Sequence, residues 1–248
     1  MTDNKPTHSD ELKAYPDEQD TAYLNIKIWL QQAIAHSAAG AYDAMHDKVA
    51  TVLDEVGITF LFAPLMHGAM KFAAPVRRDL GIRTIFNILG PLTNPAGAKR
   101  QLLGVFDPSL TETMAAVLGE LGSEHALVVH GEGGFDELSS LGSTKVSELK
   151  GGKVTTYTLD AREVGVKVGR VEDLRGGDAA LNAEIIQTIL SGKDGAPADI
   201  AVLNAGGALL VAGKVDSLRA GIELSREAIR SGAAARKLNA WKEATNNH

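Results

Sequence analysis

Two adjacent carboxylates are the residues of this chain best placed to do chemistry. Asp136 and Glu137 lie in the glycine-rich segment Gly131-Glu-Gly-Gly-Phe-Asp-Glu-Leu-Ser139, which follows the short apolar run from Ala126 to Val129. Such a run is typical of a buried parallel strand, and open α/β sheets bind ligands at the carboxyl ends of their strands. Carboxylates there suit Mg²⁺, which keeps several waters and binds substrate phosphates through one or two protein ligands. Taken alone, an acidic pair is more often part of a solvated loop, and Glu132 has no comparable claim.

A second group of residues could recognise an anion. Arg77 and Arg78 are adjacent, so on a helix their side chains would point about 100° apart and only one would face a cleft. A guanidinium pairs with a carboxylate through two parallel hydrogen bonds. His67 follows an apolar run by a few residues, where α/β proteins place ligand-binding loops. Without further context, both an arginine and a histidine in such positions are more often surface or structural residues.

The elements that must position these groups fall into three stretches. Residues 1–21 are polar and predict a mobile tail, residues 22–57 predict a reduced helical segment, and residues 58–248 predict an α/β domain. Within the second stretch, the pattern is ambiguous because part of residues 22–41 also alternates like a strand. Gly90-Pro91 and Asn94-Pro95 predict tight turns.

Helix and strand signals alternate along the rest of the chain, and several helices begin at a capping aspartate or end at a glycine. The pattern predicts an α/β fold with a largely parallel sheet flanked by helices on both faces. Helices are expected from Met45 to Gly57, from Asp107 to Gly122, from Asp178 to Gly192, over Ala205–Val211 and over Ser217–Ala244; strands over Ile58–Ala63, Ala126–Val129 and Asp199–Leu203; and a hairpin of Val146–Leu149 and Val154–Leu159 around Gly151-Gly152.

Composition argues against several classes of protein. The formal net charge is -6, and no segment concentrates enough lysine and arginine to attract nucleic acid. The chain has no cysteine, which excludes disulfides, a thiolate nucleophile and a cysteine zinc site. We find neither a secretory signal nor an apolar run long enough to span a bilayer, so we expect a cytoplasmic protein without membrane contact.

The candidate residues belong to a longer series of motifs. In their order along the chain, these motifs resemble the anthranilate phosphoribosyltransferases, the enzymes of tryptophan biosynthesis that join anthranilate to phosphoribosyl pyrophosphate (PRPP). The resemblance runs from about Val49 to the C-terminus, and its many separated motifs make it specific. They are Phe60-Leu-Phe-Ala-Pro64, His67, Met70-Lys71, Pro75-Val-Arg-Arg78, Leu80-Gly-Ile-Arg-Thr84, Ile85-Phe-Asn-Ile-Leu-Gly-Pro-Leu-Thr-Asn-Pro95, Gly131 to Ser139, Gly176-Gly-Asp178, Asn182 and Asn204-Ala-Gly-Gly207.

The resemblance implies a fold and a role for each candidate. The fold would be nucleoside phosphorylase/phosphoribosyltransferase-like, and Asp136 with Glu137 would hold Mg²⁺. Arg77 would bind the anthranilate carboxylate, His67 would line the acceptor tunnel, and Gly90-Pro91 would form a wall of the acceptor pocket. No side chain would act as a covalent nucleophile, because the anthranilate amine displaces pyrophosphate directly from ribose C1. Catalysis would come from stabilising the leaving group and from positioning the amine.

The chain departs from the family before Val49. There the family has a Gly-Thr-Gly-Gly-Asp loop, a Lys-His-Gly strand end and an Asn-Arg-Ser segment, which hold the donor phosphates and ribose, and none of these occurs in this sequence. We therefore expect little or no transfer by this chain alone, and self-association into a homo-oligomer that covers an incomplete sheet. Two alternatives stay open: a truncated or remodelled member that binds a ligand or partner without turnover, and a nucleoside-phosphorylase-like enzyme, against which Arg77 and the Gly90-Pro91 pocket argue.

Overall fold

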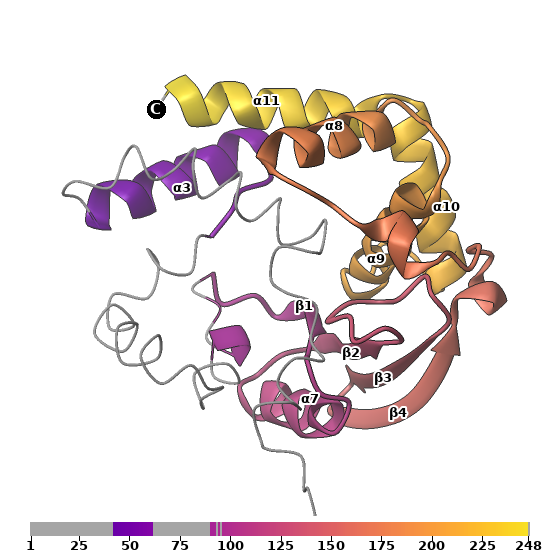
Figure 1. The fold of residues 1–248 in the computed structure, drawn as a ribbon. Coiled ribbons are helices and arrows are strands. Elements are labelled where there is room, and N and C mark those ends of the chain that lie inside the picture. Colours follow the sequence, from indigo (N-terminus) through magenta and orange to yellow (C-terminus); the bar gives the residue numbers. More distant parts are fainter. Residues whose placement is uncertain (1–41, 62–89, 93, 95, 248) are drawn as a thin grey trace, which may run out of the picture.

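A four-stranded sheet with helices on both sides forms the body of the protein in the computed structural model, which describes residues 42–61, 90–92, 94 and 96–247. The α7 helix lies on one side of the sheet, and α9 and α10 lie on the other (Figure 1). The strands, in spatial order, are β1 (Arg100–Gly104), β2 (His125–Gly131), β3 (Ser143–Lys150) and β4 (Lys153–Asp160). The helices are α3 (Tyr42–Val56), α7 (Leu110–Glu120), α8 (Ala179–Leu190), α9 (Ala196–Val211), α10 (Leu218–Arg230) and α11 (Ala233–Asn247), with 3-10 turns η2 (Ala161–Val164) and η3 (Val171–Leu174).

The core is divided by β2, which is buried on both of its faces. Leu127 and Val129 belong to the cluster that also contains Val202 and Leu203 of α9. Ala126 and Val128 point to the opposite side and join a second cluster built on α7. Full burial of each Val or Leu contributes about 1.5–3 kcal/mol. Burial on both faces explains why β2 reads as a continuous apolar run rather than an alternating one.

The sheet is mixed rather than largely parallel in the part of the chain that the structure describes. Strands β1 and β2 are parallel, while β2 with β3 and β3 with β4 are antiparallel. The α/β class is confirmed, and so is the hairpin around Gly151-Gly152. The segment between β2 and β3 contains no helix, so it makes no crossover of the kind that a parallel pair requires.

Three predicted helices are present with small shifts at their ends. The first ends at Val56, next to the predicted stop. The second starts at Leu110, because Asp107 forms a turn of its own, accepting hydrogen bonds from the Ser109 amide (2.8 Å) and hydroxyl (2.7 Å). The third begins as predicted, since the Asp178 carboxylate accepts a hydrogen bond from the Leu181 amide at 2.9 Å.

Three other predictions are wrong. The expected strand Asp199–Leu203 lies inside α9, because a short apolar run does not by periodicity distinguish a buried helix from a strand. Of the expected strand Ile58–Ala63, residues 58–61 have no regular structure and residues 62–63 lie outside the described residues. The expected last helix is two helices, α10 and α11, because the chain turns at Gly232 with φ of 71°.

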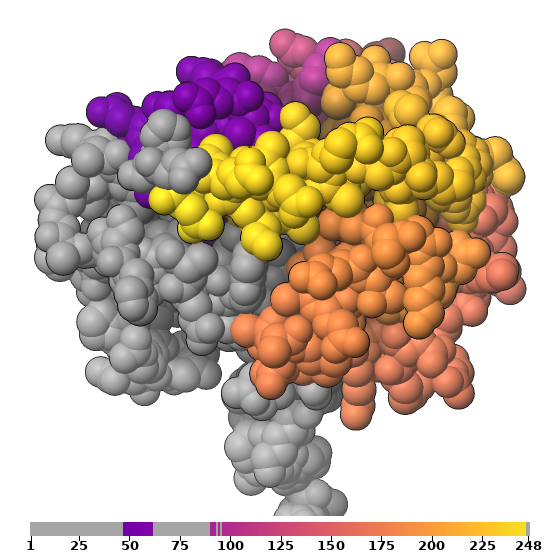
Figure 2. Space-filling model, turned by 90° about the horizontal axis from the view of Figure 1, so that it is seen from above, coloured from indigo at the N-terminus to yellow at the C-terminus, as the bar shows by residue number. Residues whose placement is uncertain are grey.

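The two ends of the described chain pack together through α11. On the face shown in Figure 2, α11 runs between α3 and α8. The Lys237 ammonium donates to the Val56 carbonyl at 2.6 Å and so satisfies the last turn of α3. No described helix is long and apolar enough to cross a membrane. The predicted tail at residues 1–21, and most of the predicted 22–57 segment, lie outside the described residues, so the division into three stretches stays a prediction.

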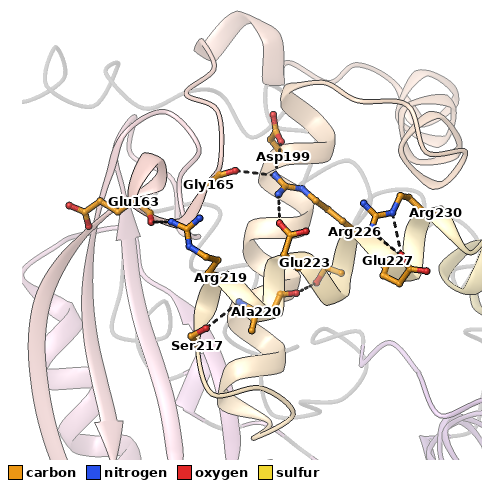
Figure 3. A network of polar contacts seen from close by, with 12 residues as sticks. Glu163, Gly165, Asp199, Ser217, Arg219, Ala220, Glu223, Arg226, Glu227 and Arg230 are labelled. Atoms are coloured by element: carbon orange, nitrogen blue, oxygen red, sulfur yellow. Dashed lines mark hydrogen bonds and ion pairs between the residues drawn. The ribbon is translucent and has the colours of Figure 1, made fainter.

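A polar network fixes the turn after the hairpin onto α10 (Figure 3). The Arg226 guanidinium donates to the Gly165 carbonyl at 3.2 Å and to Glu223 at 2.9 Å, and it lies 3.6 Å from Asp199 of α9. Burial raises the pKa of Asp199 despite the nearby Arg226 charge. One arginine on α10 thereby joins α9 and the segment that follows β4, which keeps that side of the sheet closed.

Candidate functional site

The acidic pair lies at the carboxyl end of β2, as the sequence predicts. Strand β2 ends at Gly131, and Asp136 and Glu137 follow in the loop that leads to β3. Because β1 runs parallel to β2, the carboxyl end of β1 at Gly104 lies on the same edge of the sheet. The loop crosses directly over it: a Cβ built on Gly104 would lie 1.4 Å from the Asp136 carbonyl oxygen.

A second glycine and two side chains hold the loop against the sheet edge. A Cβ on Gly131 would lie 2.7 Å from the Glu137 carbonyl oxygen, so the backbone after the pair also lies close to β2. The Ser139 hydroxyl donates to the Glu132 carbonyl at 2.8 Å, which ties the two ends of the loop together. The Glu132 carboxylate accepts a hydrogen bond from the Ser143 amide at 2.8 Å. Glu132 therefore acts on the loop as a structural residue, whereas no side-chain partner of the acidic pair is found among the described residues.

The two carboxylates of the pair have different surroundings. Asp136 is exposed, whereas Glu137 is half-buried. Burial, and secondarily the charge of Asp136, raises the pKa of Glu137 to about 7. Within residues 96–247, no hydrogen bond or ion pair to another side chain is found for either carboxylate. The ionised pair is therefore unfavourable by itself, and a cation or a proton would stabilise it.

The donor set fits Mg²⁺. Among the described residues, no group of three or more His, Cys, Asp or Glu side chains gathers around a possible metal position. A site enclosed by protein ligands, of the kind that holds structural zinc, is thus absent from this part of the chain. Two carboxylates at an open sheet edge match the way Mg²⁺ is held, with the remaining positions filled by water and substrate phosphate oxygens.

A pocket elsewhere on the same loop does not include the acidic pair. Its volume is about 350 Å³, and its charged groups are already paired. Glu132 bonds to Ser143, and Asp160 binds Arg162 through both carboxylate oxygens. The pocket is lined by Glu132, Leu141, Gly142, Ser143, Asp160, Arg162 and Val168, and not by the acidic pair.

The predicted acceptor residues are described only in part. Gly90, Pro91 and Leu92 are helical, so the tight turn predicted at Gly90-Pro91 is wrong. Leu92 packs against the cluster built on α7. A Cβ on Gly90 would meet no described residue within 4 Å. His67 and Arg77 lie outside the described residues. Their roles, and the wall formed by Gly90-Pro91, therefore stay predictions.

Two residues that touch the acidic loop were not singled out as site residues from the sequence. Gly104 allows the close approach of the Asp136 backbone, and the Asn204 side chain bonds to both backbone groups of Leu138. Asn204 was visible as part of a motif, but no pattern indicated which segment it contacts. Gly104 ends a short strand and carries no sequence signal of its own.

Comparison with known proteins now assigns the family. Residues 37–235 match the model of the glycosyl transferase family, a/b domain. The chain belongs to this family. The match covers the sheet, the acidic loop and helices α7 to α10, so the site described above lies entirely within the glycosyl transferase domain.

Similar curated members of the glycosyl transferase family are anthranilate phosphoribosyltransferases. The chain is 53% identical to that of Moorella thermoacetica over 204 residues, which cover 81% of this chain and 60% of the relative. It is 50% identical to that of Symbiobacterium thermophilum over 203 residues, or 82% of this chain and 60% of the relative. The chain thus spans about 60% of the length of these relatives.

Solved structures of the same enzyme share the fold. The anthranilate phosphoribosyltransferase of Thermus thermophilus superposes with a TM-score of 0.74 at 42% identity, over 80% of this chain and 59% of that one. That of Saccharomyces cerevisiae, solved in complex with PRPP and Mg, gives 0.75 at 27% identity, over 82% and 58%. These likenesses confirm the predicted resemblance to the family.

Proposed function

We propose that this chain carries the metal-binding and acceptor-binding part of an enzyme that transfers the phosphoribosyl group of PRPP to anthranilate. The observation that carries the proposal is the pair Asp136 and Glu137 at the carboxyl end of β2, without a protein partner among the described residues. Two such carboxylates need a cation when both are ionised. The relatives at about 50% identity, and the yeast relative's complex with PRPP and Mg, support Mg²⁺, PRPP and anthranilate as the ligands.

Each residue then has a role in one displacement reaction. Asp136 and Glu137 hold Mg²⁺, which when bound offsets the charge that develops on the leaving pyrophosphate. Arg77 orients anthranilate by its carboxylate, while His67 and the Gly90-Pro91 pair confine its ring, so that the amine is held close to ribose C1. The amine is the nucleophile, and therefore no side chain has to form a covalent bond to the sugar.

The acceptor role of Arg77 predicts a large loss of anthranilate affinity in Arg77→Ala. A guanidinium–carboxylate pair out of solvent contributes about 2 kcal/mol or more, or about 30-fold in affinity. Anthranilate fluorescence gives the titration directly. Arg78→Ala is the matched control, because on a helix the adjacent side chain points about 100° away. Equal affinities of wild type and Arg77→Ala would refute the role.

Turnover is tested with PRPP, anthranilate and Mg²⁺ while light scattering reports the mass of the protein. We expect binding but slow transfer, because the family motifs for the donor phosphates do not occur in these 248 residues, and loss of even one preorganised contact to developing charge costs about 10²- to 10³-fold. Binding without any transfer would favour the non-catalytic alternative. Phosphorolysis of a nucleoside would favour the other alternative. Efficient transfer by a monomer would contradict the role given to those motifs.

A further inference from the structure

The amide side chain of Asn204 makes three hydrogen bonds, two of which join α9 to the acidic loop. Its Oδ1 accepts from the Leu138 amide at 2.9 Å, and its Nδ2 donates to the Leu138 carbonyl at 2.9 Å. The same Nδ2 donates to the Ile200 carbonyl, one turn back along α9, at 3.0 Å. The bonds also fix which atom is oxygen, because the reversed amide would set an N–H group against the Leu138 N–H.

The clamped residue directly follows the acidic pair. The Leu138 N–H and the Glu137 carbonyl belong to one peptide plane, so a bond to that N–H fixes the orientation of the backbone that carries Glu137. The Leu138 side chain is fully buried, and a Cβ on Gly207 of α9 would lie 2.7 Å from it. The leucine is thus held by its backbone at Asn204 and by its side chain over Gly207, one turn apart on the same helix.

We infer that Asn204 is a positioning residue. Through its hydrogen bonds to the Leu138 backbone, it sets the position and orientation of Asp136 and Glu137 for binding a cation. The inference rests on the proposed function of the pair. A carboxylate in a loop loses orientational freedom when it binds a cation between itself and a phosphate, and a loop that is already fixed loses less. The clamp replaces the backbone pairing that a strand would provide at this point, where the chain has left β2 and has not yet entered β3.

Asn182 is a matched control within the same protein. Its side chain is buried on a helix, whereas that of Asn204 is half-buried. The Asn182 side chain accepts from the Gly177 amide at 3.0 Å and donates to the Gly177 carbonyl at 2.7 Å. It makes the same kind of clamp on a different segment, the one that enters α8. Loss of the Asn182 amide removes both bonds to Gly177, and loss of the Asn204 amide removes both bonds to Leu138 and the bond to Ile200 within α9. Each variant thus loses one pair of bonds between a helix and the segment that it holds, so both should be destabilised.

The test measures pyrophosphate binding in the presence of Mg²⁺ by calorimetry in Asn204→Ala and Asn182→Ala. We expect Asn204→Ala to weaken this binding about tenfold or more, the typical effect of removing a group that orients a metal ligand, and Asn182→Ala to change it less than about twofold on the same scale. Hydrogen exchange at the Leu138 amide should accelerate only in Asn204→Ala. In a Glu137→Gln background, Asn204→Ala should cause no further loss of affinity, because the residue acts through the carboxylate.

Three results would overturn the inference. The first is unchanged affinity in Asn204→Ala with a deprotected Leu138 amide. The second is an equal loss in both asparagine variants, which would reflect general destabilisation. The third is wild-type protein that shows no Mg²⁺-dependent pyrophosphate binding. This result would overturn the proposed function as well, whereas the first two results would overturn only the role of Asn204. Should Asn204→Ala fail to fold, Asn204→Asp keeps the acceptor for the Leu138 amide and loses the donor to its carbonyl; normal affinity in that variant would equally refute the inference.

Discussion

Gly104→Ala should abolish Mg²⁺-dependent pyrophosphate binding and lower the free energy of unfolding by about 3 kcal/mol. The added Cβ would lie 1.4 Å from the Asp136 carbonyl oxygen and 2.2 Å from its carbon. Both are backbone atoms, so no change of rotamer relieves the overlap. Because Gly104 is fixed by its pairing with Val129 of β2, the acidic loop has to move, and the two carboxylates move with it. Calorimetry and urea unfolding measure the two effects.

Gly119→Ala provides the control for adding a methyl group. Its Cβ would meet only the Leu149 side chain, at 3.2 Å, which can shift, and alanine is favoured over glycine inside a helix by about 1 kcal/mol. We expect this variant to be as stable as wild type or more so, with unchanged pyrophosphate affinity. Intact binding in Gly104→Ala would show that the loop does not depend on its contact with β1.

Glu137→Gln should make the metal-free protein more stable above pH 7 and indistinguishable from wild type near pH 4. The pKa of Glu137 is raised from 4.5 to about 7 in the folded protein. The fold therefore favours the protonated form, and its stabilising contribution is lost as the pH rises from 4.5 through 7. At pH 8 the ionised group costs up to about 3 kcal/mol, which the neutral amide avoids. Urea unfolding at both pH values measures the difference.

Addition of Mg²⁺ with pyrophosphate should make wild type more stable than Glu137→Gln, because the cation stabilises the carboxylate and not the neutral amide. Glu112→Gln, which removes one exposed carboxylate on α7, should show neither the pH-dependent gain nor the reversal. A stability difference between wild type and Glu137→Gln that does not vary with pH would contradict the burial of this carboxyl group.

The parts of the fold that followed from the sequence are those with a local signal. The helix stop at Gly57, the capping Asp178 and the continuous apolar run of β2 each reflect interactions within a few residues. The helical state of Asp199–Leu203 has no such signal, because α9 is apolar on most sides and its periodicity is weak. The antiparallel pairing of β2 with β3 and of β3 with β4 made the sheet mixed, and the full pairing pattern was not predicted. The direction of pairing depends on contacts between strands and has no local signal in the sequence.

The site shows the same division. Asp136 and Glu137 were identified because both their type and their place after a buried run point to a ligand site. The groups that hold them come from elsewhere: Asn204 is 66 residues from Leu138 along the chain, and Gly104 belongs to another strand. Contacts at such separations leave no spacing pattern in one sequence, so their role emerged only from the packing of α9 and β1 against the loop.

The most direct test of the account is calorimetric titration of pyrophosphate, with and without Mg²⁺, into wild type, Asp136→Asn and Glu137→Gln at pH 8. Wild type should bind pyrophosphate in a strongly Mg²⁺-dependent way, because at pH 8 the Glu137 carboxyl is ionised and the acidic pair has no cation from the described part of the protein. Each variant should lose most of the Mg²⁺-dependent component, by about 1.5–3 kcal/mol for a charge-assisted contact, while Glu112→Gln keeps it. Mg²⁺-dependent binding of equal strength in wild type and both variants would contradict the assignment of the acidic pair.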